Sequence, residues 1–245
     1  MIDLIELRKI SNIKNLNLGQ AEKYFYQDVL LFILYKKYAR ELVFKGGTAL
    51  SKCYGFDRFS EDLDFTVNDI NNLKETLDYG LKDFNIKYEL DEKKFKDSLQ
   101  IKISINGPLF NGSKQSLCTV KLDFSFREKV LLGKEIIKIR PNLASLPFFD
   151  VIIMNKKEIF AEKIRAIMTR KQARDLYDLY YLDDSVCEIE LINKKLSYYN
   201  MSFNKKGFIT KLDDYENIWD AEMKYLTKNY PDFPLVKKKI SSYFN

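Results

Sequence analysis

Two aspartates two residues apart, Asp62 and Asp64, are the residues of this chain best suited to hold a metal ion. They fall in a run, 62–67, where polar and apolar residues alternate, so in a strand both carboxylates project from one face. Two carboxylates so close repel each other unless a cation or a proton lies between them. Mg²⁺ takes one or two carboxylates and completes its shell with water and substrate phosphate. The pair therefore predicts a magnesium site.

A pair of glycines, Gly46 and Gly47, precedes these aspartates in the chain. Val43 and Phe44 lead into the pair as a strand, and the glycines let the backbone turn tightly and approach a ligand closely. Thr48 stands where a helix should begin, so free amides and a hydroxyl would face one spot suited to phosphate. Either feature alone is more often an ordinary turn or a solvated strand face. Together, in this order, they indicate nucleotide chemistry.

A further carboxylate, Asp123, lies on the polar side of a later strand, 120–126. The apolar positions there are Val120, Leu122, Phe124 and Phe126, and the polar ones are Lys121, Asp123 and Ser125. An aspartate in such a place is ordinarily solvated. On its residues alone, Asp123 is thus an isolated carboxylate on the polar face of an otherwise strongly apolar strand.

A lysine lies within the apolar arc of the helix expected over 157–170. At about 100° per residue, that arc contains Ile159, Phe160, Ile164, Ala166 and Ile167. Lys163 falls inside it, whereas Glu158, Glu162 and Arg165 fall outside. A lysine so placed must extend its ammonium to solvent, pair with a buried acid or point at a ligand.

On the next expected helix, 172–182, Asp175 and Asp178 share one border of the apolar stripe. Arg174 could cap this helix or pair with either acid. The candidate partners of Lys163 are therefore Asp178, Asp175 and a bound triphosphate.

These stretches resemble a known family. A Gly-Gly turn followed by Asp-x-Asp is the pattern of nucleotidyltransferases of the DNA polymerase β type. The strings 44–52 and 58–65 are more specifically similar to the AbiEii family of nucleotidyltransferase toxins, whose later motifs resemble residues 161–167 and 174–179. The four stretches occur in the right order and take in residues 44–182.

The resemblance implies a role for each site residue. The implied metal ligands are Asp62, Asp64 and Asp123, with Asp123 also helping to deprotonate an acceptor hydroxyl. The implied nucleotide-binding residues are Lys45, Gly46, Gly47, Thr48, Ser60, Lys163, Arg174 and Asp175. Lys163 and one aspartate of the 174–178 motif complete the implied catalytic set, Asp178 being preferred to Asp175 on spacing.

The implied reaction transfers a nucleoside monophosphate from an NTP to an acceptor hydroxyl, with one or two Mg²⁺ ions, and releases pyrophosphate. In the family the acceptor is tRNA, and a cognate antitoxin neutralises the growth-inhibiting activity. A small-molecule nucleotidyltransferase of the antibiotic-modifying kind is the alternative. A nucleotide-binding regulator without catalysis is a third reading, against which the intact Asp-x-Asp argues.

Composition excludes several other functions. Apolar residues make up 46% of the chain, which excludes a disordered protein. The absence of histidine removes imidazole zinc sites and Ser-His-Asp hydrolysis. Lys and Arg outnumber Asp and Glu by 41 to 35, which permits contact with nucleic acid. Much of the basic charge lies in lysine runs of the second half, at 156–157, 194–195, 205–206 and 237–239.

The three cysteines, Cys53, Cys118 and Cys187, are widely separated and odd in number. They indicate reduced thiols and a cytoplasmic protein. No apolar run is long enough to cross a bilayer, and the amino terminus is unlike a signal peptide, so no membrane partner is expected.

The expected fold class is α+β: an amino-terminal nucleotidyltransferase domain with a mixed sheet, residues 1–154, and a helical carboxy-terminal domain, residues 155–245, with the nucleotide held between them. The boundary follows the irregular stretch flanked by Pro141 and Pro147. Helices are predicted over 20–40, 71–84, 191–200, 203–212 and 215–229, with Asn68 or Asp69 as the candidate start of the second, and further strands over 88–90 and 99–105.

Overall fold

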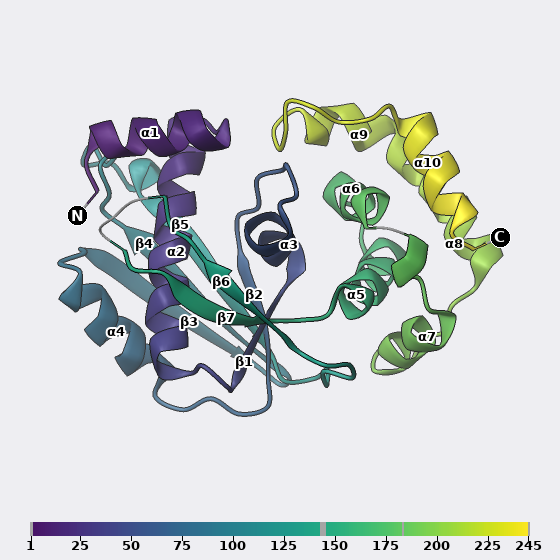
Figure 1. Cartoon of the computed structure of the whole chain (residues 1–245), viewed down its shortest axis with the longest axis horizontal. Helices are drawn as coiled ribbons and strands as arrows, with labels where there is room; N and C mark the ends of the chain where they lie inside the picture. Colours follow the sequence, from purple (N-terminus) through teal and green to yellow (C-terminus); the bar gives the residue numbers. More distant parts are fainter. Residues whose placement is uncertain (1, 143–145, 183, 245) are drawn as a thin grey trace. The chain divides into compact units, whose positions relative to one another are not determined.

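The chain divides into two compact units in the computed structural model, which describes residues 2–142, 146–182 and 184–244 (Figure 1). The first unit comprises Met1–Cys53, Glu61–Lys129 and Lys134–Ile153, and the second comprises Tyr54–Ser60, Val130–Gly133 and Met154–Asn245. The last of these breaks in the chain lies between Ile153 and Met154. The pattern gave no sign that residues 54–60 and 130–133 group with the helical unit. Residues 143–145 of the predicted irregular stretch lie outside the described part.

The first unit contains a seven-stranded mixed sheet, as predicted, in the order β3-β4-β5-β2-β1-β7-β6. The strands are β1 (Leu42–Lys45), β2 (Leu63–Val67), β3 (Tyr88–Phe95), β4 (Ser98–Ile105), β5 (Cys118–Ser125), β6 (Glu135–Ile139) and β7 (Phe149–Ile153). β2 and β5 are parallel, as are β1 and β7, and the other neighbours are antiparallel.

The helices of this unit are α1 (Leu4–Lys14), α2 (Leu18–Lys37), α3 (Gly46–Tyr54), which ends one residue into the second unit, and α4 (Leu73–Asp83), with a short 3₁₀ turn, η1 (Lys114–Ser116). Asn17 and Gln20 form a capping box that starts α2. The predicted start of α4 at residue 68 or 69 is wrong, because Asn72 precedes the first turn. In Figure 1, α2 crosses one face of the sheet.

The face of the sheet covered by α2 is aromatic. Phe44, Phe65 and Phe124 occupy one row across β1, β2 and β5, with ring centroids 5.5 and 5.1 Å apart. Phe149 shares this face, because it lies an even number of residues from Ile153, the partner of Phe44. Phe32 of α2 packs on Phe149 with ring centroids 5.6 Å apart. The residues between those aromatic positions, including Asp64, therefore face away from α2.

The second unit is helical. Its elements are α5 (Lys156–Thr169), α6 (Ala173–Tyr181), η2 (Asp184–Val186), α7 (Ile189–Ser197), α8 (Lys205–Leu212), η3 (Asp213–Tyr215), α9 (Glu216–Met223) and α10 (Phe233–Ser242). The predicted helix over 215–229 is wrong in its second half. The observed helix, α9, ends at Met223, whose carbonyl accepts from the amides of Leu226 and Thr227. The carbonyl of Leu226 accepts from the amide of Phe59.

No helix in the described ranges 2–142, 146–182 and 184–244 is long and apolar enough to span a membrane.

Candidate active site

The glycine turn brings the backbone against the carboxylate of Asp64. Gly46 has φ +75° at the junction of β1 and α3, a conformation that favours glycine. A Cβ built on Gly46 would lie 2.3 Å from Asp64 Oδ2. Lys45, the preceding residue, is the register partner of Asp64 across β1 and β2. Glycine is therefore required here for both its conformation and its lack of a side chain.

Asp64 and Asp123 are direct register partners on the parallel strands β2 and β5. Partners in register project from the same face, and adjacent strands are about 4.8 Å apart. Gln100, the partner of Asp123 on β4, donates from Nε2 to Asp123 Oδ1 at 2.7 Å. Both aspartates are partly accessible. The predicted third carboxylate thus stands beside the second, on the face opposite α2.

Asp62 lies just before β2, and the backbone around it is held by two side chains. Thr48 Oγ1 donates to the carbonyl of Asp62 at 2.5 Å, and Gln27 Nε2 donates to the carbonyl of Glu61 at 2.9 Å. The sequence predicted that the Thr48 hydroxyl would contact phosphate. That contact stays a prediction; in this structure the hydroxyl ties the glycine turn to the start of β2.

Lys45, also predicted to bind nucleotide, forms an ion pair inside the first unit. Its Nζ lies 3.3 Å from Glu128 Oε2, and both side chains are buried. Glu128 was not identified from the sequence, because nothing local distinguishes it from an exposed glutamate at a strand end.

The carboxylates suit a divalent cation that also binds phosphate. In the described residues, no three Asp, Glu or Cys side chains converge into a closed metal cage. Mg²⁺ does not need one, since it usually takes one or two carboxylates and fills its other positions with water and phosphate. Asp64 and Asp123 supply such an open set of oxygens, and Asp62 lies two residues before Asp64 in the chain. These residues therefore fit Mg²⁺ carried with a nucleotide.

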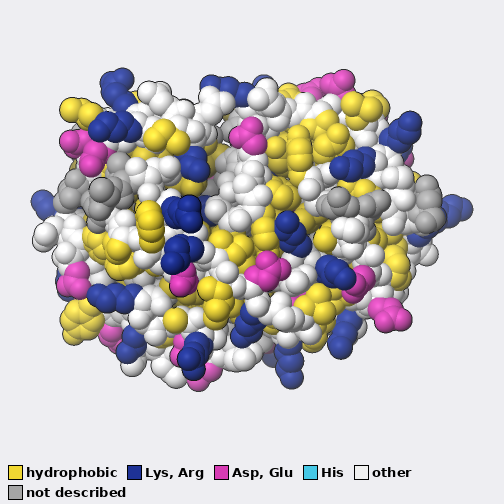
Figure 2. Space-filling view, in the orientation of Figure 1, with side chains coloured by type: hydrophobic (Ala, Val, Ile, Leu, Met, Phe, Trp, Pro, Cys, Tyr) yellow, Lys and Arg dark blue, Asp and Glu magenta, His cyan; other side chains and the backbone are white. Residues whose placement is uncertain are grey.

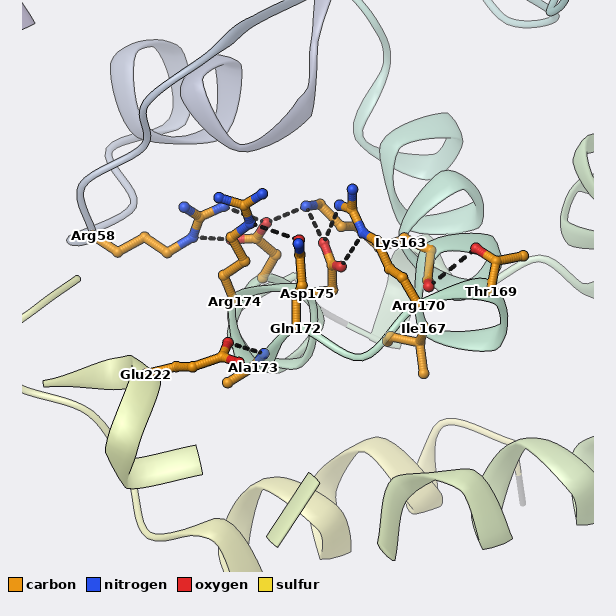
Figure 3. Close-up of polar contacts among 12 residues, drawn as sticks. Arg58, Lys163, Ile167, Thr169, Arg170, Gln172, Ala173, Arg174, Asp175 and Glu222 are labelled. Atoms are coloured by element: carbon orange, nitrogen blue, oxygen red, sulfur yellow. Dashed lines mark hydrogen bonds and ion pairs between the residues drawn. The ribbon is translucent and has the colours of Figure 1, made fainter. Parts of the chain in front are cut away.

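The second unit contains an ion-pair cluster, defined by Arg58, Lys163, Arg170, Asp175 and Asp178, in which Arg170 is exposed and the other four residues are buried. Lys163 Nζ lies 2.8 Å from Asp175 Oδ1 and 2.6 Å from Asp178 Oδ2. Arg170 donates from Nε to Asp175 Oδ2 at 2.9 Å. Figure 3 shows Asp175 of α6 between Lys163 and Arg170, with Arg58 reaching α6 from the loop that precedes β2.

Asp178 is fully buried within this cluster. Arg58 donates to both of its oxygens, from Nε and Nη2, each at 2.6 Å. The side chains of Arg58 and Asp178 are 1% and 0% exposed. Burial alone would raise the pKa of Asp178, but the charges of Arg58 and Lys163 outweigh burial and hold that pKa below its usual value. The pKa of Asp175 is likewise lowered, since Lys163 and Arg170 outweigh its burial.

Of the partners proposed for Lys163 from the sequence, both internal acids are therefore used. Arg174, expected to cap α6 or pair with an acid, donates to Gln172 Oε1 at 3.1 Å instead. Ser60 belongs to the second unit and is half-buried. Arg58 stood in the quoted motif, but its role was missed, because Asp178 lies 120 residues away in the chain.

Glu158 corrects the helical-wheel analysis of α5. It was placed outside the apolar arc, yet it is fully buried. Its carboxylate accepts from the amides of Leu131 and Leu132 at 2.8 and 3.0 Å, and Lys195 Nζ lies 2.9 Å away. An acid in a polar part of the wheel can thus be buried when another segment supplies donors.

Cys53 and Cys118 are not reactive thiols. Together with Cys187 they are thiols rather than disulfides. Burial raises the pKa of Cys53 and of Cys118 to about 12, so neither forms much thiolate at neutral pH. Neither of these two thiols is therefore a candidate nucleophile.

Gly46→Ala tests the glycine turn. The added methyl would force a strained backbone, costing about 1–3 kcal/mol, and would push the Asp64 carboxylate from its place. We expect Mn²⁺ affinity, measured by paramagnetic resonance, to fall at least tenfold while the protein still folds. Gly55→Ala is the matched control, because Gly55 also has positive φ but has nothing within 4 Å of an added Cβ. Equal Mn²⁺ affinity in the two variants would contradict the proximity of Gly46 to the metal site.

The family model described as "Nucleotidyl transferase AbiEii toxin, Type IV TA system" matches residues 30–238. Two solved structures share the fold. MenT4, a nucleotidyltransferase toxin from Mycobacterium tuberculosis H37Rv, is 18% identical with a TM-score of 0.69, over 97% of this chain and 88% of its own. JHP933 from Helicobacter pylori is 20% identical with a TM-score of 0.64, over 92% of this chain and 89% of its own. No curated protein matches the sequence.

Proposed function

Because the chain belongs to the AbiEii family of nucleotidyl transferase toxins of type IV toxin–antitoxin systems, we propose that it transfers a nucleoside monophosphate from an NTP to an RNA acceptor. The 3′ end of tRNA is the proposed acceptor, and Mg²⁺ is the proposed metal. Family membership makes the protein a nucleotidyltransferase and implies a cognate antitoxin. The observation that best supports the proposal is the register pair of Asp64 and Asp123 beside the Gly46 turn.

Asp62 and Asp64 would hold the metal with Asp123 beside them. When bound, Mg²⁺ would offset the negative charge of the phosphates. Asp123 would accept the proton of the acceptor hydroxyl at Oδ2, since Oδ1 already accepts from Gln100. The acceptor oxygen then bonds to the α-phosphorus as the bond to the β-phosphate oxygen breaks, and pyrophosphate leaves. The amides at Gly46 and Gly47 would orient the phosphates.

The test is transfer of label in the purified protein. Total RNA would be incubated with each NTP labelled at the α or the γ phosphate, with Mg²⁺ or with EDTA. The proposal predicts that α-label enters RNA, that γ-label does not, and that EDTA abolishes the incorporation. If α-label moved only to added small molecules such as aminoglycosides, the acceptor would be a small molecule and the RNA proposal would fail.

The basic side chains should support RNA binding without acting on the nucleotide. Figure 2 shows Lys and Arg side chains in small groups across one face of the molecule. Lys205 and Lys206 begin α8 and are exposed. Phosphate contacts make binding salt-dependent, with a slope of about 0.7 per contact for single strands.

Lys205→Glu with Lys206→Glu should therefore raise the KM for RNA several-fold and flatten its salt dependence by about 0.7 per lost contact, leaving the KM for NTP unchanged. The double variant Lys93→Glu with Lys94→Glu is the control, since both lysines are exposed on β3. An unchanged RNA KM at Lys205 and Lys206 would place the RNA surface elsewhere.

A further inference from the structure

Both strands that carry the candidate metal ligands are joined to short segments of the second unit. Residues 54–60 lead through Glu61 and Asp62 into β2. Residues 130–133 follow β5 a few residues after its end. Each segment is anchored inside the second unit by a buried carboxylate.

The first anchor is Asp178, which holds residues 54–60 through Arg58. Arg58 binds both oxygens of Asp178 and also donates from Nη1 to the carbonyl of Phe59 at 3.1 Å. The amide of Phe59 donates to Leu226 at 2.8 Å, and Tyr177 Oη donates to the carbonyl of Asp57 at 3.0 Å. Together these bonds fix the backbone just before the metal-binding aspartates.

The second anchor is Glu158, which holds residues 130–133. One carboxylate oxygen accepts from the amide of Leu131 and the other from the amide of Leu132. Lys195 neutralises Glu158, and both side chains are 0% exposed. The carboxylate therefore fixes two successive peptide groups beyond β5.

Directional bonds explain why charged groups are retained at these buried positions. Burying a carboxylate is costly, and a hydrophobic replacement is often as stable. An apolar contact, however, would not fix the orientation of a guanidinium or of two amides. A misplacement of about 1 Å at a reacting centre can cost roughly 10²-fold in rate, so accurate placement of the two strand ends has a functional value.

We propose that Asp178 and Glu158 are positioning residues: each fixes the backbone of a segment next to a strand that carries candidate metal ligands, Asp178 the residues before β2 and Glu158 the residues after β5. The proposal rests on the proposed function. It differs from the role that the family resemblance implied for Asp178, because both oxygens of that side chain are enclosed by Arg58 and Lys163. Neither acid would touch the substrate.

The experiment uses the full chain with Asp178→Asn and Glu158→Gln, and Asp220→Asn on the exposed side of α9 as control. Amide hydrogen exchange is followed in peptides covering 54–60 and 130–133, and Mn²⁺ affinity is measured by paramagnetic resonance. Losing a hydrogen bond to a charged group costs about 1.5–3 kcal/mol, which corresponds to roughly 10- to 150-fold faster exchange. Asp178→Asn should accelerate exchange only in 54–60, and Glu158→Gln only in 130–133.

Both variants should weaken Mn²⁺ binding at least tenfold, lower kcat and leave the KM for NTP within about twofold. Arg58→Lys keeps one charged hydrogen bond and should show a smaller effect, which also covers the case in which Asp178→Asn does not fold. The double variant Arg58→Met with Asp178→Leu should lose no more activity than Arg58→Met alone or Asp178→Leu alone, because the two side chains act as a unit.

Asp178→Asn with wild-type exchange in 54–60, wild-type Mn²⁺ affinity and no transfer would overturn the proposal, since Asp178 would then touch the substrate. Exchange and Mn²⁺ binding are measured without NTP. They therefore decide the positioning role even if the wild-type protein transfers nothing to RNA, a result that would reject only the proposed function.

Discussion

Replacing Asp64 with alanine is expected to reduce nucleotidyl transfer by roughly 10³-fold or more in a protein that still folds. Asp64 is the central carboxylate, with Asp123 in register on one neighbouring strand and Lys45 on the other. A bound divalent metal supplies several kcal/mol of transition-state stabilisation, and each 1.36 kcal/mol corresponds to a tenfold change in rate. Initial rates at saturating NTP and RNA, with circular dichroism to monitor folding, provide the measurement.

Asp91→Ala is the matched control, because Asp91 is an exposed aspartate on β3 of the same sheet. Asp62→Ala should resemble Asp64→Ala. Asp123→Asn keeps the bond to Gln100 possible but removes the proton acceptor, so its activity should recover partly as pH rises and hydroxide replaces the lost base. Wild-type turnover in a folded Asp64→Ala protein would refute the metal assignment.

Alternation in the sequence predicted the two strands that matter most for the site. β2 and β5 follow a strict period of two, and a period of two also determines which face each aspartate occupies. β6 was not predicted, because Glu135 to Ile139 alternates weakly and Ile136 remains exposed at the edge of the sheet. A strand of this kind is specified by its pairing with β7, which local pattern cannot reveal.

The pairing of Asp64 with Asp123 was also beyond local pattern, since register depends on contacts between distant segments. The same limit applies to charged residues that are buried by distant partners. Glu158 and Lys163 lie on one helix and were separated by the helical wheel, yet both are buried in ion pairs. Residue type and spacing could predict that Lys163 needs a partner, but only the fold shows that Asp175 and Asp178 both serve.

Replacing Asp178 with alanine is expected to destabilise the protein by roughly 3–5 kcal/mol, the range for breaking a buried ion pair by removing one partner. Arg58 would lose both hydrogen bonds to its carboxylate, and Lys163 would lose one of its two acids. Asp178→Asn should also lose stability measurably, because Arg58 and Lys163 enclose the carboxylate and the variant removes its charge.

Lys163→Met should lower the free energy of unfolding by less than Asp178→Ala does. A single lysine–acid pair would give the opposite order. Without Lys163, Asp178 keeps Arg58 and Asp175 keeps Arg170. The methionine also retains the apolar stem. Equilibrium urea unfolding of both variants, beside Asp220→Ala as the exposed control, measures the order. A Lys163→Met protein less stable than Asp178→Ala would show that the lysine, not Asp178, is the centre of the cluster.

Acid titration should separate the charge of Asp178 from its packing. A carboxylate whose pKa is lowered in the folded state stabilises that state above its unfolded pKa of about 3.9, and the contribution is lost as pH falls towards the folded pKa. The pKa values of Asp175 and Asp178 are both lowered. The difference in unfolding free energy between wild type and Asp178→Asn should therefore be largest near pH 7 and shrink below about pH 4. A difference that stays constant from pH 7 to pH 3 would mean that folding does not lower the pKa of Asp178, and that its ion pairs with Arg58 and Lys163 add no net stability.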